Sequence, residues 1–60
     1  MDMERNLIEH MITVVRNDIE QCENDYNTAE TVEKKLDAFQ MSIMLDKRLA
    51  ALYEAQDNLP

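Results

Sequence analysis

The chain has 60 residues, a net charge of −7, one cysteine and no glycine. A single cysteine excludes an internal disulfide, and the lone His10 has no second histidine or nearby cysteine to complete a zinc site. The acidic balance argues against binding to the nucleic-acid backbone, and no apolar stretch is long enough to span a membrane.

A domain of this size buries too little apolar surface to offset comfortably the conformational entropy lost on folding. Such chains usually depend on disulfides, a metal ion or oligomerisation, and only oligomerisation fits this composition. We therefore expect one cytoplasmic domain over residues 1–60 that forms a homo-oligomer, binds a protein partner, or does both. We expect no cofactor, no metal, and no nucleic-acid or membrane partner.

The first segment predicts a helix over about residues 3–24. Its apolar residues alternate at spacings of four and three, which is the a/d pattern of a heptad seam. This seam consists of Ile8, Ile12, Val15, Ile19, Cys22 and Tyr26. Leu7, Met11 and Val14 lie beside it and widen the apolar stripe.

A break follows this helix. Asn24, Asp25 and Asn27 are weak helix formers that favour caps and turns. In one continuous helix, the apolar stripe that starts at Val32 would also lie roughly 240° from the first stripe. We therefore predict a turn at about residues 25–27, where Asn27 and Glu30 resemble a capping box.

The second segment predicts a helix over about residues 28–56 with two apolar faces. One face contains Val32, Leu36, Phe39, Ile43 and Ala50. The other lies nearly opposite and contains Ala38, Met41, Leu45, Leu49 and Leu52. Because a hairpin can cover only one face, we expect the second set to stay uncovered and to form a dimer or partner interface.

These elements predict an all-α fold. A β-sheet would need several tight turns, which are disfavoured in a chain without glycine. The expected architecture is an antiparallel two-helix hairpin. A second copy would complete it most simply as a dimeric four-helix bundle, and a helix from another partner chain would serve equally well.

The net charge is concentrated near the predicted turn. Residues 17–33 contain no lysine or arginine, and their acidic residues are Asp18, Glu20, Glu23, Asp25, Glu30 and Glu33. This acidic tip is either a solvated turn that keeps the protein soluble or a docking site for a basic surface on a partner.

A short motif lies in the second helix. The residues Ser-Ile-Met-Leu-Asp at positions 42–46, followed by Leu49 and Tyr53, match the pattern S-x-x-L-D. This segment resembles the small sporulation-regulating aspartyl-phosphate phosphatases of bacilli, and Ile12 and Arg16 are similar to that family's I-x-x-x-R spacing. Those proteins are helical hairpins that act on a phosphorylated response regulator.

The resemblance implies that Ser42 and Asp46 help to engage a response regulator. The chain departs from the family at Ile43 and Met44, where glutamine and glutamate are usual, and its connection between the two motifs is several residues longer.

The sequence contains no Ser/His/Asp set, Gly-rich phosphate loop or metal-ligand cluster, so we assign no catalytic residue. The leading interpretation is a small acidic, non-enzymatic interaction module, such as a regulator, inhibitor or co-chaperone. One alternative is a phosphatase-like regulator. Another is an acidic decoy for a nucleic-acid-binding surface.

Overall fold

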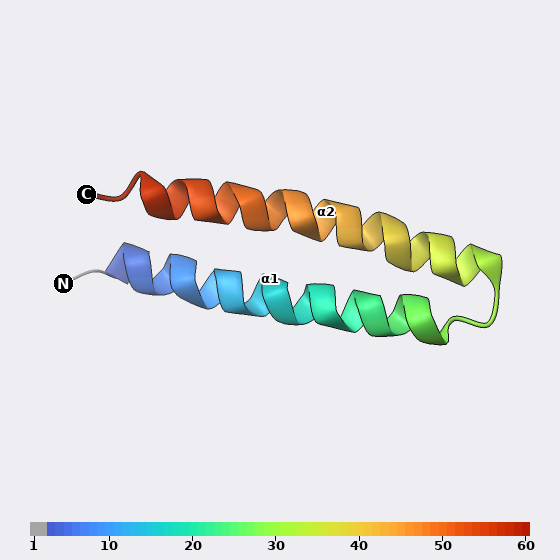
Figure 1. Cartoon of the computed structure of the whole chain (residues 1–60). Coiled ribbons are helices and arrows are strands. Elements are labelled where there is room, and N and C mark those ends of the chain that lie inside the picture. The colour runs from blue at the N-terminus through green and yellow to red at the C-terminus, as the bar shows by residue number, and fades with distance from the viewer. Residues whose placement is uncertain (1–2) are drawn as a thin grey trace.

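The computed structural model describes residues 3–60. Helix α1 (Met3–Thr28) and helix α2 (Val32–Asp57) lie side by side and run in opposite directions, so both chain ends lie at one end of the molecule (Figure 1). No strand occurs in the described part of the chain, and the predicted all-α hairpin is confirmed. The Cα atoms span 48 × 14 × 10 Å, so the outer side of each helix has nothing to cover it.

Helix α1 packs on α2 through the predicted seam. Ile12, Val15 and Cys22 are buried, and Ile8 and Ile19 are half-buried. The 4-3 spacing therefore correctly identified the side of α1 that faces its partner helix from Ile8 to Cys22, whereas Tyr26, the last residue of the predicted seam, is 42% exposed.

The turn lies at residues 29–31, so the predicted turn at 25–27 and the predicted helix limits on either side of it are wrong. The last turn of α1 is held by side chains that bond within the helix. The Thr28 hydroxyl donates to the carbonyl of Asn24 at 2.8 Å, and the Gln21 amide donates to the carboxylate of Asp25 at 3.1 Å. Of these two bonds, the one between Gln21 and Asp25 is of the i, i+4 kind that stabilises a helix.

The residue that caps α2 is Thr31, and not Asn27 as predicted. Its backbone is extended (φ −128°, ψ 155°), and its hydroxyl accepts a hydrogen bond from the Lys34 N–H at 3.1 Å. No described residue has a positive φ, which explains how the chain turns without glycine.

Helix α2 packs on α1 through the face that we expected to stay uncovered. Leu45 is buried in a cluster with Val15 and Cys22, and Leu49 and Leu52 pack against that cluster. Met41 alone fits the prediction, with half of its surface exposed. The prediction of an uncovered face is therefore wrong for Ala38, Leu45, Leu49 and Leu52.

The inward face of α2 follows a 4-3 pattern that runs along the whole helix. We call this pattern the inner seam, and it consists of Lys35, Ala38, Ser42, Leu45, Leu49, Leu52 and Gln56. Because the turn is centred on residue 30, residues 45–52 of α2 lie beside residues 8–15 of α1. At that level the inner seam has three leucines. The other face of α2, which begins at Val32, has only Asp46 and Ala50 there.

Replacing Leu45 with alanine tests this packing. Leu45→Ala removes a buried side chain, so we expect the free energy of unfolding to fall by about 2–3 kcal/mol. The adjacent Met44 is 64% exposed, and Met44→Ala is the matched control. We expect the control to change the free energy of unfolding by less than about 0.5 kcal/mol. Urea denaturation followed by circular dichroism measures both, and equal losses would contradict the inner seam.

Candidate functional site

An exposed stripe runs along one flank of α2, next to the face that packs on α1. Its members also recur at 4-3 spacing, and at 100° per residue the stripe is turned by about 100° from the inner seam. We call it the outer seam, and it consists of Val32, Leu36, Phe39, Ile43, Asp46, Ala50 and Tyr53. Its first four side chains are between 40% and 73% exposed.

Helix α2 therefore carries two heptad seams, of which the hairpin uses one. A surface helix normally has one apolar stripe and a polar opposite side. A second stripe at coiled-coil spacing is typical of a helix that packs against two neighbours. The outer seam is thus the surface of this chain best suited to receive another helix.

Asp46 interrupts the outer seam near its middle. It lies one turn after Ile43 and one turn before Ala50, and it is exposed in the isolated chain. A carboxylate is well solvated there, but it would lose that solvation if a partner covered the seam.

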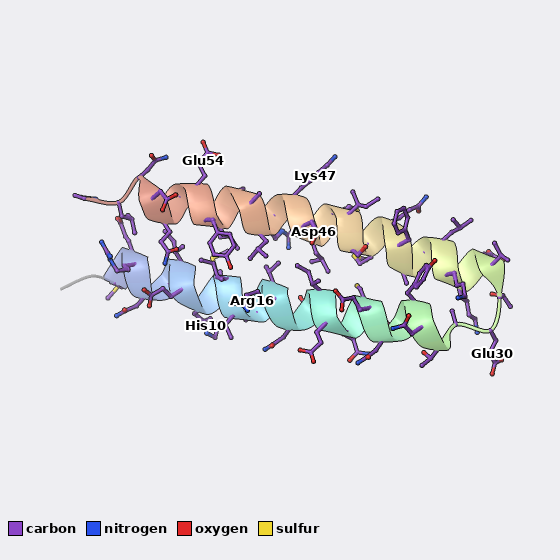
Figure 2. All side chains as sticks on the ribbon, in the orientation of Figure 1. His10, Arg16, Glu30, Asp46, Lys47 and Glu54 are labelled. Atoms are coloured by element: carbon purple, nitrogen blue, oxygen red, sulfur yellow. The ribbon has the colours of Figure 1, made fainter. Side chains whose placement is uncertain are left out.

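The other residues of the phosphatase-like motif lie nearby. Ser42 belongs to the inner seam, is half-buried, and donates its hydroxyl hydrogen to the carbonyl of Phe39 at 2.7 Å. Arg16 is exposed on α1, and Figure 2 shows Arg16 and Asp46 on facing helices near the middle of the hairpin. The hairpin thus brings these residues into one region, although the Ser42 hydroxyl already has a partner in its own helix.

No known protein family, curated protein or solved structure matches this chain.

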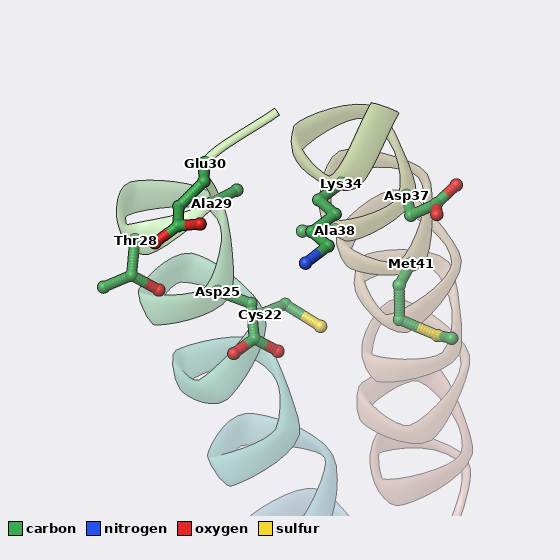
Figure 3. Close-up of a pocket in the computed structure, with 9 residues that line it drawn as sticks. All are labelled: Cys22, Asp25, Thr28, Ala29, Glu30, Lys34, Asp37, Ala38 and Met41. Carbon is green, nitrogen blue, oxygen red and sulfur yellow. The ribbon is translucent and has the colours of Figure 1, made fainter. Parts of the chain in front are cut away.

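The six residues of the predicted acidic tip are all exposed, but they do not form one patch. Glu23 lines a hollow on the Phe39 side of the hairpin, whereas Asp25 lines a hollow on the Met41 side. Lys34 lies among the tip carboxylates and extends from α2 towards α1 (Figure 3). The tip is therefore of mixed charge. The charge count over residues 17–33 missed this, because Lys34 and Lys35 come directly after that range.

The two hollows lie on either side of the contact between Cys22 and Ala38, which line both of them. Their volumes are about 620 Å³ and about 470 Å³. They exist because the seam residues at this level have small side chains, so the helices are less completely packed near the turn than at their middle. On the Phe39 side, the hollow adjoins Tyr26, whose ring lies 4.7 Å from the Lys35 Nζ.

The free thiol of Cys22 lies between these hollows and is buried. Burial raises the pKa of Cys22, and the nearby carboxylates of Asp25 and Asp18 raise it further. The thiol therefore stays protonated at neutral pH, which is the opposite of what a nucleophile requires. His10 is exposed on α1 (Figure 2).

Residues 3–60 offer neither a metal site nor a membrane-spanning helix. No group of histidine, cysteine, aspartate or glutamate side chains is arranged to hold a metal ion. Neither α1 nor α2 is apolar over a length that could cross a membrane.

The raised pKa of Cys22 predicts a loss of stability in alkaline solution. The folded protein holds the thiol proton more tightly than the unfolded chain does. This contribution is therefore complete below the ordinary thiol pKa of 9.0 and is lost as the pH rises through the folded-state pKa.

Thermal melts of the wild type and of Cys22→Ala isolate this effect, because other groups that titrate at high pH are common to both proteins. The stability advantage of the wild type should shrink above about pH 9. A constant difference between the two proteins across that range would contradict the assignment.

Proposed function

We propose that this protein is a non-enzymatic interaction module that binds a helix of another chain through the outer seam of α2. The observation that supports the proposal is the exposed 4-3 stripe that begins at Val32 and continues through Leu36, Phe39 and Ile43. A small regulator, inhibitor or co-chaperone would use such a surface.

The energetics favour an occupied seam. Covering a Val, Leu, Ile or Phe side chain contributes about 1.5–3 kcal/mol, reduced here in proportion to the part that is already buried. Several such side chains together are comparable to the whole stability of a small domain. A partner that binds only the folded hairpin would also stabilise it by mass action.

A double substitution in the outer seam tests the proposal. Leu36→Gln with Ile43→Gln removes apolar surface from residues that are already 53% and 40% exposed, so the hairpin should remain folded. We expect the variant to lose partners that the wild type captures from an extract of its native organism. We also expect it to lose any self-association seen by sedimentation equilibrium.

The matched control is Leu7→Gln with Met44→Gln, which removes exposed apolar surface outside the outer seam. The control should behave as the wild type in both measurements. Unchanged capture and unchanged mass for the outer-seam variant would show that this face is not an interface.

A phosphatase-like regulator is the second candidate, favoured by the proximity of Arg16, Ser42 and Asp46 in the hairpin. On this hypothesis, Asp46→Ala should abolish an accelerated loss of phosphate from a phosphorylated response regulator. The melting temperature should stay the same or rise slightly, because alanine is the better helix former. A regulator decay assay beside a thermal melt measures both effects, and no acceleration by the wild type would end this hypothesis.

A further inference from the structure

We infer that the outer seam receives a helix from a different protein, and that this helix places a lysine or arginine opposite Asp46. The inference rests on the proposed function and identifies the chemistry of the partner. It depends on one feature of α2, which is a single carboxylate within an otherwise apolar exposed stripe.

The position of Asp46 determines what the partner must supply. Apolar or aromatic side chains lie on both sides of it, from Val32 to Ile43 and from Ala50 to Tyr53. A helix long enough to cover both parts would also cover the carboxylate and remove its water. A desolvated carboxylate is strongly unfavourable unless a cation or hydrogen-bond donors replace that water. A long cationic side chain from the facing seam meets this need directly.

The outer seam of a second copy does not supply that cation. The outer seam contains no lysine or arginine. If two outer seams paired over their full length in antiparallel fashion, Asp46 would face Phe39 of the second copy. If they paired in parallel, it would face the same carboxylate. The net charge of −7 on each copy opposes either pairing further.

The same carboxylate also argues against an anionic occupant. A nucleic acid or an acidic lipid surface would place negative charge against Asp46 and against a molecule that is already acidic. A cationic amphipathic helix is the occupant that satisfies both the apolar residues and the carboxylate.

Two designed helical peptides test this inference. Both are about 21 residues long, which is three heptads, and both carry a leucine and isoleucine seam on an uncharged background. They differ at one central seam position, which is lysine in the first peptide and leucine in the second. Fluorescence anisotropy in about 0.15 M salt measures the affinity of each labelled peptide, because distant charges are largely screened there.

The protein variants complete a double-mutant cycle. Asp46→Leu makes the outer seam continuous, and Asp46→Asn removes the charge with little change of shape. Asp37→Leu is the matched control, because it removes the same charge from an exposed position of α2 that lies off the outer seam. Phe39→Gln reports whether binding uses the outer seam at all.

We expect the wild type and Asp37→Leu to bind the lysine peptide about tenfold more tightly than the leucine peptide. Asp46→Leu should reverse that order, and Asp46→Asn should remove most of the preference for lysine. Phe39→Gln should weaken the binding of both peptides.

Three results would overturn the inference. The first is that the wild type and Asp46→Leu show the same ratio of affinities for the two peptides. In that case the proposed function would still stand if Phe39→Gln weakened the binding of both peptides. The second is no binding of the lysine peptide by the wild type. The third is a wild-type dimer in sedimentation equilibrium that Ile43→Gln dissociates, which would assign the outer seam to a second copy.

Discussion

The packing of Leu45 against Val15 and Cys22 is the constraint on which the rest of the structure depends. Two helices can bury only one face each, and this cluster fixes which faces they are. Once the leucines of α2 are turned towards α1, every residue of the outer seam is turned towards solvent. The exposed apolar stripe is therefore a direct consequence of the core, because α2 has more apolar faces than α1 can cover.

The core also explains where the hairpin is well packed and where it is not. Large aliphatic side chains meet in the middle of the hairpin, whereas Cys22, Ala38 and Ser42 occupy the seams nearer the turn. Small side chains leave the two hollows beside Cys22, whose pKa is raised by burial and by the carboxylates of Asp25 and Asp18.

Much of this fold could be predicted from the sequence, because periodicity reports directly on burial. The seam from Ile8 to Cys22 was readable as a 4-3 pattern, and two segments of that kind predict a hairpin. The turn was misplaced because the low helix propensity of Asn24 and Asp25 is a weak effect that tertiary packing can override, and both residues lie within α1. The outward face of α2 was misassigned because both of its faces are apolar. Only the position of the turn decides which residues of α2 lie beside the isoleucines of α1.

That misassignment shows how the two seams of α2 differ. The inner seam carries its large residues at the level where α1 can cover them, and its polar positions lie elsewhere along the helix. The outer seam carries Asp46 at that same level, where a polar residue weakens the competing packing of this face on α1. Within the isolated chain, Asp46 thus favours the hairpin in which the inner seam packs on α1 over the one in which the outer seam would do so. An outer seam without a charge would pair readily with any apolar helix, whereas Asp46 disfavours a partner that covers the seam without supplying a cation or hydrogen-bond donors.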